Sequence, residues 1–182
     1  MFRSRNQQAL EQTRQQLAVQ NQILDAISHT MAMVEFSPQG EILTANSSFL
    51  HILGYESSEL LGKHHSLLCP PDLIRSSEYQ RFWQRLANGE SFSDRFMRLA
   101  KGGRPVWLEA SYIPVTDQQG KVIKVIKLAT DITRAMKAEQ EHKSLLTAIN
   151  RSMAVIEFTL DGQIVDANEN FLKTVGYRLE EV

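Results

Sequence analysis

The sequence contains one segment twice, and this repeat limits the possible folds more than any other feature. Residues 26–60 read AISHTMAMVEFSPQGEILTANSSFLHILGYESSEL, and residues 148–182 align with them without a gap as AINRSMAVIEFTLDGQIVDANENFLKTVGYRLEEV. The offset of 122 residues is too long for a solenoid, whose repeats run to about 20–50 residues. It suits one small domain followed by a linker helix. We therefore expect a complete domain at 28–133, a connector helix at 134–150 and the start of a second copy at 151–182, as in a fragment of a longer tandem protein.

A hairpin and a capped helix are predicted at the start of the first copy. Two short apolar runs, Ala32–Phe36 and Glu41–Ala45, are separated by a segment that contains Pro and Gly, as in a β-hairpin. Asn46 then stands where an N-cap is expected, and Gly54 stands where the following helix ends. Two more short helical segments are expected near Ser57 and near the Pro-Pro-Asp sequence at 70–72.

A longer helix and three strands complete this copy. From Ser77 to Asn88, large apolar side chains recur with the spacing of one helix face: Tyr79, Phe82, Trp83 and Leu86. Three strands with Gly-containing turns between them follow, at Phe92–Lys101, Pro105–Thr116 and Lys121–Asp131. Five strands with a helical insertion predict an α+β fold. The alternation in the fourth strand places Val106, Leu108, Ala110 and Tyr112 on the inner face and Trp107, Glu109 and Ser111 on the outer face.

Residues 1–27 predict an N-terminal helix that joins two copies of the chain into a homodimer. Leu10, Leu17 and Leu24 fall seven residues apart, although polar Thr13 and Gln20 at the interleaved positions specify a coiled coil only weakly.

Composition excludes several classes of protein. The formal net charge of −1 gives no sign of a nucleic-acid partner, and no apolar run approaches the length of a membrane span. A single cysteine, Cys69, excludes an internal disulfide. No Gly-rich phosphate loop or nucleophile motif is present, so we expect a cytoplasmic protein that is not an enzyme.

The order of elements and a set of short motifs resemble the PAS family. The motifs are Asn46, Gly54-Tyr55, Gly62-Lys63, Lys101-Gly102-Gly103, Trp107 and Asp131-Ile132-Thr133. The resemblance implies an antiparallel sheet of order 2-1-5-4-3 with helices on one face. The stretches GKHH, EYQRFWQRL, KGGRPVWLEASYIPV and KLATDIT are similar to the tandem PAS modules of bacterial chemoreceptors of the aerotaxis and biofilm-dispersion types. This implies a signalling domain further along the protein, although PAS modules also precede histidine kinases and cyclic-dinucleotide enzymes.

The resemblance also implies a ligand site, with FAD as the expected cofactor. Trp83 stands where flavin-binding relatives carry a tryptophan that faces the flavin, and otherwise it fills the core. Arg98 stands where such relatives often have an Asn; it can contact a flavin carbonyl or phosphate but not the ring N–H, or else it points to solvent. Phe96 is assigned to the same site.

The remaining candidates are polar residues outside the long helix. His65 stands where relatives line the ligand chamber, and haem is the alternative cofactor if His64 or His65 ligates it; otherwise both histidines are solvated loop residues. Asn46 is a helix cap first and a ligand contact second. Asp131 stands where the last strand meets the connector helix and is assigned to signal relay, or else it only caps that helix.

Two hypotheses follow from the sequence. In the first, the chain is a sensory module that binds a small ligand or FAD for redox or oxygen sensing. In the second, it is a cofactor-free PAS module for dimerisation and signal relay.

Overall fold

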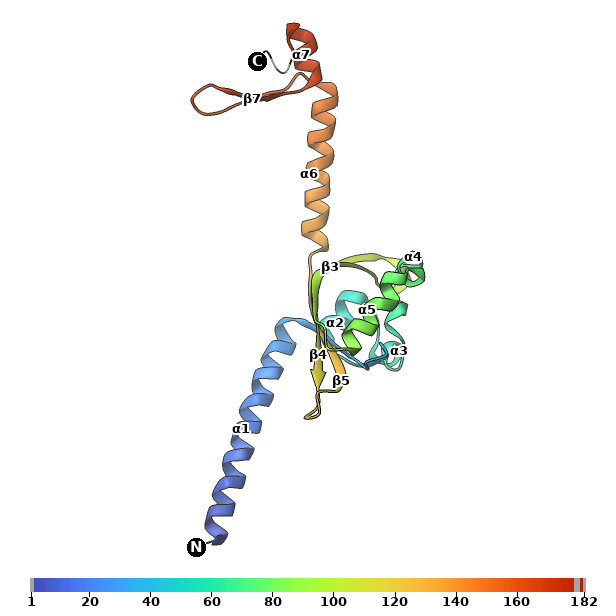
Figure 1. Ribbon diagram of the computed structural model, residues 1–182, viewed down its shortest axis with the longest axis vertical. Helices are drawn as coiled ribbons and strands as arrows, with labels where there is room; N and C mark the ends of the chain where they lie inside the picture. The colour runs from blue at the N-terminus through green and yellow to red at the C-terminus, as the bar shows by residue number, and fades with distance from the viewer. Residues whose placement is uncertain (1, 179–180, 182) are drawn as a thin grey trace. The chain divides into compact units, whose positions relative to one another are not determined.

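The computed structural model (Figure 1) describes residues 2–178 and 181, without the side chains of residues 2–6, 8, 9, 24, 27 and 29. The chain divides into two compact units, residues 1–133 and 134–182. Among the described residues, no helix is both long enough and apolar enough to cross a membrane.

The first unit contains the predicted five-stranded antiparallel sheet. Its strands are β1 (Ala32–Phe36), β2 (Ile42–Ala45), β3 (Phe92–Leu99), β4 (Pro105–Thr116) and β5 (Val122–Asp131). They pair in the order β2-β1-β5-β4-β3, so the order implied by the family resemblance is confirmed. The central position of β5 brings the end of the chain's first domain next to its first strand.

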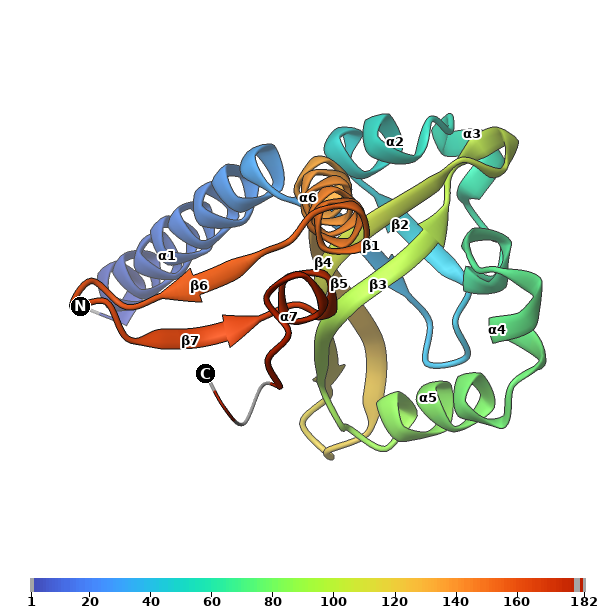
Figure 2. The same cartoon turned by 90° about the horizontal axis from the view of Figure 1, so that it is seen from above.

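Helices cover one face of this sheet (Figure 2), and this also agrees with the expectation. They are α2 (Ser47–Leu53), α3 (Ser57–Leu60), α4 (Pro71–Arg75) and α5 (Ser77–Ala87), with short 3-10 turns η1 (His65–Leu68) and η2 (Lys101–Gly103). The α5 face is buried through Tyr79, Trp83 and Leu86, because the period of its apolar residues matches the helical turn. The core lies between this layer and the inner face of the sheet.

The alternation predicted for β4 is confirmed. Its inner residues Val106, Leu108, Ala110 and Tyr112 are all at most 4% exposed, whereas Glu109 is exposed and Trp107 and Ser111 are half-buried. Successive side chains of a strand point to opposite faces, so the polar set lies on the side away from the helices.

The two copies of the repeat build the same local structure. Asn46 and Asn168 both accept a hydrogen bond from the backbone N–H three residues on, as helix caps do. Gly54 and Gly176 end the two helices with φ of 71° and 77°, a conformation that glycine adopts without strain. The predicted cap and stop signals are therefore confirmed in both copies.

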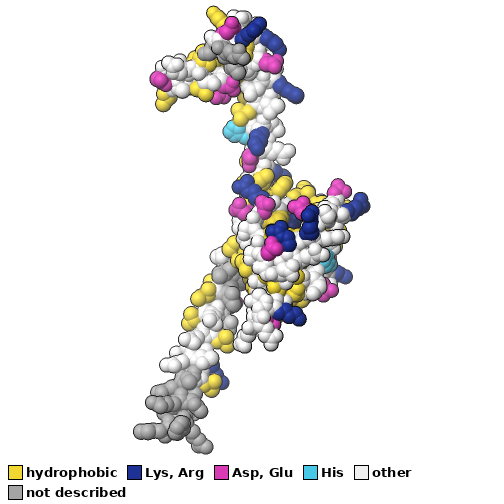
Figure 3. Space-filling view, in the orientation of Figure 1, with side chains coloured by type: hydrophobic (Ala, Val, Ile, Leu, Met, Phe, Trp, Pro, Cys, Tyr) yellow, Lys and Arg dark blue, Asp and Glu magenta, His cyan; other side chains and the backbone are white. Residues whose placement is uncertain are grey.

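The terminal and connecting helices are longer than the sequence suggested. The first helix, α1, spans Phe2–Thr30 rather than ending at 27, because residues 28–30 contain neither Gly nor Pro. Along it, Leu10 and Leu17 are 54% and 57% exposed, and Figure 3 shows hydrophobic side chains along this helix. The connector, α6, spans Thr133–Ser152 rather than 134–150. The side chain of Leu24 lies outside the described residues.

The second unit holds the beginning of the second copy. After α6 it contains the hairpin β6 (Ile156–Phe158) and β7 (Ile164–Ala167) and the helix α7 (Glu169–Val175). Phe158 and Ile164 are 57% and 37% exposed, as expected for strands whose core-forming partners are not in this unit. The second short helix predicted for this copy falls at residues that the structure does not fully describe.

Candidate functional site

A buried polar cluster lies between the inner face of the sheet and helix α5. Its members come from five elements: His65 from η1, Tyr79 and Trp83 from α5, Arg98 from β3, Tyr112 from β4 and Lys127 from β5. We call this set the chamber cluster. Each of its side chains is at most 7% exposed, which is unusual for cationic groups, because an unpaired charge is costly to remove from water.

His65 is the hub of the chamber cluster. Its Nδ1 lies 2.9 Å from the Tyr79 hydroxyl, and its Nε2 lies 3.1 Å from the Tyr112 hydroxyl. The backbone of His65 is also fixed, because its N–H donates to the Gly40 carbonyl at 2.8 Å. The side chain is fully buried, so the alternative of a solvated loop histidine is wrong for His65. The η1 turn folds the loop inward beneath the β1–β2 hairpin and places the imidazole in the core.

His64 lies outside the chamber cluster, although its ring is near Tyr79 and Trp83, with centroids 6.4 and 6.1 Å away. Its Nε2 lies 2.9 Å from the Gln39 carbonyl, and its Nδ1 accepts from the Ser66 backbone N–H at 3.1 Å. It is half-buried and caps the η1 turn, so it is a structural residue rather than a solvated one.

Arg98 is also buried, and the alternative that it points to solvent is wrong. Its Nη1 donates to the Met97 carbonyl at 2.8 Å, and its Nη2 donates to the Tyr112 hydroxyl at 3.2 Å. The guanidinium lies over the Phe96 ring, 4.9 Å from the centroid. Its Nε is buried without a hydrogen-bond partner among the described residues. Phe96 thus lies beside Arg98.

Lys127 brings a second positive charge to the same phenol. Its Nζ lies 4.9 Å from the centroid of the Tyr112 ring and 6.0 Å from that of Phe49. Lys127 and Tyr112 are direct partners in the β4–β5 register, so both side chains leave the sheet on its inner face. Among the described residues, neither Lys127 nor Arg98 forms an ion pair with a carboxylate.

The positive charges control the ionisation of the cluster. Burial lowers the pKa of His65 well below its ordinary value, and the charges of Arg98 and Lys127 lower it further. Burial opposes ionisation of Tyr112, but the charges of Lys127 and Arg98 outweigh it and bring the pKa of this phenol below its usual value. Burial lowers the pKa of Lys127. The interior therefore favours neutral histidine and attracts negative charge to the Tyr112 oxygen.

Trp83 lies in the core against the β1–β2 turn. Its ring meets Phe36 and His65 edge-on, with centroids 5.4 and 5.3 Å away. A Cβ on Gly40 would come within 2.8 Å of the Trp83 ring, so the turn and the indole are closely packed. The Trp83 Nε1 is buried without a hydrogen-bond partner among the described residues. A buried N–H of this kind costs free energy unless something pairs with it.

A pocket of about 170 Å³ adjoins the chamber cluster between α4, α5 and β3. We call this pocket together with the chamber cluster the chamber. Its walls are mainly apolar, with Arg98 at one side and two acidic residues among the others: Leu73, Tyr79, Phe82, Phe96, Arg98, Glu78 and Asp94. Pockets for drug-sized ligands have about 300–1,000 Å³. The chamber as packed therefore does not fit the three-ring system of a flavin, nor a haem, and both ring nitrogens of His65 already have partners.

Asn46 and Asp131 do not join the chamber cluster. All the polar groups of the Asn46 side chain bind backbone: Oδ1 accepts from Met33 and Phe49, and Nδ2 donates to the Ser28 and Met31 carbonyls at 2.6 and 2.8 Å. Asn46 thus connects the end of α1 to β1 and α2. Asn168 makes the same four kinds of bond in the second unit.

Asp131 lies at the junction between β5 and α6. Its Oδ1 accepts from the Thr133 backbone N–H at 2.8 Å. Thr133 Oγ1 in turn accepts from the Trp107 N–H at 3.0 Å, and the Ile132 N–H donates to the Trp107 carbonyl at 2.9 Å. The first residue of α6 is therefore bound directly to β4, the strand that carries Tyr112.

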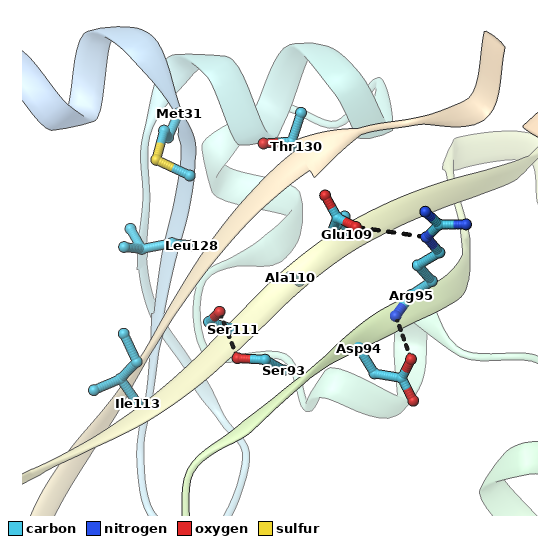
Figure 4. Close-up of a pocket in the computed structure, with 10 residues that line it drawn as sticks. All are labelled: Met31, Ser93, Asp94, Arg95, Glu109, Ala110, Ser111, Ile113, Leu128 and Thr130. Atoms are coloured by element: carbon cyan, nitrogen blue, oxygen red, sulfur yellow. Dashed lines mark hydrogen bonds and ion pairs between the residues drawn. The ribbon is translucent and has the colours of Figure 1, made fainter. Parts of the chain in front are cut away.

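A second pocket, on the outer face of the sheet, has different chemistry (Figure 4). It measures about 550 Å³, and its polar groups are paired with one another: Arg95 with Glu109 at 3.5 Å and Ser93 with Ser111 at 2.7 Å. Met31, Ile113 and Leu128 line its other side in Figure 4. The outer-face pocket therefore differs from the chamber cluster in that its arginine is paired with a carboxylate.

Sequence reasoning did not identify three members of the site: Tyr79, Tyr112 and Lys127. Tyr79 and Tyr112 were assigned to apolar faces without a polar role. Lys127 had a usable signal, because it falls between Val125 and Ala129 in the inward-facing set of β5, where a charged residue is unexpected.

Comparison with known families agrees with this architecture. Residues 24–136 match the model of a family described as PAS fold. The chain belongs to the PAS family. The PAS domain of a protein from Colwellia psychrerythraea is similar in structure, with a TM-score of 0.55 and 20% identity over 64% of this chain and 98% of that one.

Two curated relatives are longer proteins. The chain is 50% identical to the biofilm dispersion protein BdlA of Pseudomonas aeruginosa over 157 residues, which are 86% of this chain and 38% of that protein. It is 28% identical to the aerotaxis receptor of Escherichia coli over 95 residues, 52% of this chain and 18% of that one. The chain therefore spans well under half the length of either relative.

Proposed function

We propose that the chain is the sensory input module of a bacterial signalling protein of chemoreceptor type, which binds a small molecule in the chamber and transmits the binding state to α6. The observation that carries the proposal is the chamber cluster itself. It buries two cations and leaves two N–H groups, Arg98 Nε and Trp83 Nε1, without partners among the described residues, and Arg98 also lines a pocket. Buried polar groups are otherwise almost always paired, and an unpaired set beside a cavity is typical of a binding site.

The path to the output is short. Tyr112 and Trp107 lie on the same strand, and Trp107 binds Thr133, the first residue of α6, through its N–H and Ile132, the residue before it, through its carbonyl. A ligand that changes the position of Tyr112 changes the strand to which α6 is attached. A coupling of about 1–3 kcal/mol between two sites is ordinary for such a device. The likeness to BdlA and to the aerotaxis receptor supports a receptor role.

The test is a thermal-denaturation screen of the whole chain against a library of small metabolites. The matched variant is Leu73→Trp, which fills the pocket from its α4 wall and leaves every residue of the chamber cluster unchanged in the sequence. We expect some compounds to raise the melting temperature of the original protein and not of Leu73→Trp. If every stabilising compound acts equally on both proteins, the pocket is not the binding site.

FAD is the second candidate ligand, and the unpaired indole N–H of Trp83 favours it. It requires the aromatic side chains of α5 to move apart, because the pocket is too small for the ring system. An absorbance spectrum of freshly purified protein tests it. Flavin bands near 450 nm, lost in Trp83→Ala and retained in Trp83→Phe, would support FAD, whereas a colourless protein supports the smaller ligand.

Dimerisation through α1 completes the proposal. Leu10 and Leu17 expose more than half of their surface on this helix, and a partner helix would cover them. Sedimentation of a chain that lacks residues 1–17 should show a weakened dimer, whereas an undiminished dimer would place the association elsewhere.

A further inference from the structure

The two buried cations on the inner face of the sheet lack a negative partner. On β5, Lys124 faces the outer side and pairs with Glu35 at 2.7 Å, as a half-buried lysine ordinarily does. Lys127, three residues later and 1% exposed, has no such carboxylate among the described residues. Arg98, which is 4% exposed, likewise has no carboxylate partner among the described residues. The groups of acidic character that act on the charges of Arg98 and Lys127 are the phenol of Tyr112 and the thiol of Cys69.

Arg98 lines the pocket and has hydrogen-bonding groups that are not fully used. Within the part of the chain that the structure describes, its Nε has no hydrogen-bond partner and its Nη2 reaches only the Tyr112 hydroxyl at 3.2 Å, near the long end of the range for such bonds. A guanidinium binds a carboxylate through two parallel N–H groups, and these bonds are shorter and stronger than a bond to a neutral hydroxyl. The Lys127 ammonium lies 4.9 Å from the centroid of the Tyr112 ring and does not line the pocket, so it would attract such a carboxylate through its charge rather than by direct contact.

The pocket walls define the rest of the ligand. Leu73, Phe82 and Phe96 present apolar surface, so a phosphate or sulfate would leave several oxygens unpaired there. Glu78 and Asp94 line the same pocket and are exposed, so they would repel a second carboxylate at that end. The volume of about 170 Å³ limits the ligand to a few carbon atoms.

We infer that the pocket beside Arg98 binds a small monocarboxylic acid with an apolar body, whose carboxylate is held by Arg98 and attracted by the buried charge of Lys127. This inference rests on the proposed sensory function and names its ligand class. It makes the chamber an anion-selective site in which the ligand supplies the negative charge that the fold leaves out.

The test is a fluorescence titration of the whole chain with butyrate, its neutral isostere butyramide, and inorganic phosphate at equal ionic strength. Butyrate should bind about ten- to a hundredfold more tightly than butyramide, as expected for a hydrogen-bonded charge. Arg98→Met should reduce butyrate binding to the level of butyramide while leaving the melting temperature unchanged or higher, because it removes an uncompensated buried charge. Lys127→Met should reduce butyrate binding in the same direction, and it carries the test if Arg98→Met does not fold.

The outcomes separate the two proposals. Butyramide or phosphate binding as tightly as butyrate would overturn the carboxylate assignment, and so would butyrate binding that survives Arg98→Met. If butyramide binds equally well and Leu73→Trp blocks it, the sensory function stands and only the ligand class is wrong. If neither the probes nor any library compound binds in a manner that Leu73→Trp blocks, the proposed function itself fails.

Discussion

Lowering the pH should destabilise the domain through His65. The titratable and charged groups that face its ring from the surrounding elements are Tyr79, Tyr112, Arg98, Lys127, Cys69 and His64, and none of them is a carboxylate. The folded state therefore keeps the imidazole neutral, whereas the unfolded chain takes up a proton near pH 6.5. The unfolded state binds more protons below that pH, so stability falls as the pH falls.

The size of the effect follows from linkage. Below pH 6.5 each pH unit costs about 1.4 kcal/mol as long as the folded-state pKa is not reached, so the free energy of unfolding should drop by about 2 kcal/mol from pH 7 to pH 5. The assay is urea denaturation followed by circular dichroism at pH 7, 6 and 5. His65→Gln is the matched control, since it removes the titrating ring and keeps hydrogen-bonding groups.

The variant separates His65 from every other titrating group. At pH 7 the His65→Gln variant should itself be about 1–3 kcal/mol less stable, because the buried hydroxyls of Tyr79 and Tyr112 lose well-aligned hydrogen bonds to the ring. Its further loss between pH 7 and 5 should be smaller than that of the original protein by about 2 kcal/mol. Equal losses in the two proteins would refute the reasoning, because they would mean that His65 protonates as easily in the folded chain as in the unfolded one.

Three further predictions use the repeat and the turns. Asn46→Ala should lower the free energy of unfolding by about 2–3 kcal/mol in the urea assay, since it removes a helix cap and the bonds to α1 and β1; Asn168→Ala should leave this transition unchanged, and an equal effect of both would contradict the prediction. Gly40→Ala should cost about 1–3 kcal/mol more than Gly120→Ala in thermal denaturation, because both have positive φ but only the first new Cβ meets a ring, at 2.8 Å; equal costs would mean that the turn yields freely. A chain cut after Asn150 should keep the melting temperature of the first domain, because the chain divides into two compact units and the first ends at Thr133; a large loss would make the second unit part of the first.

Local patterns were sufficient for most of the fold. The alternation of β4 placed Tyr112 inward and Trp107 outward, and Asn46 and Gly54 marked the bounds of a helix, because caps and strand faces depend on nearest neighbours in the chain. The PAS resemblance then supplied the strand order, which no local pattern contains.

The site was less accessible to sequence reasoning. Trp83, Arg98, His65 and Phe96 do lie together, but the burial of His65 depends on the η1 turn folding beneath the hairpin, which only tertiary packing determines. Arg98 reaches Tyr112 although the two residues are not paired in the β3–β4 register, because its side chain is long. A partner that depends on side-chain reach cannot be predicted from strand register alone.

The central claim is that a ligand in the chamber changes the attachment of α6. The two tryptophans of the chain allow the most direct test of this claim. Trp83 reports on the chamber, and Trp107 reports on the junction, where its backbone binds Ile132 and Thr133. The measurement is a titration of the two indole N–H resonances by nuclear magnetic resonance, with a compound that stabilises the protein but not Leu73→Trp. We predict that both resonances shift with the same midpoint. A shift of Trp83 alone would show binding without relay to α6, and a compound that shifts neither would contradict the central claim.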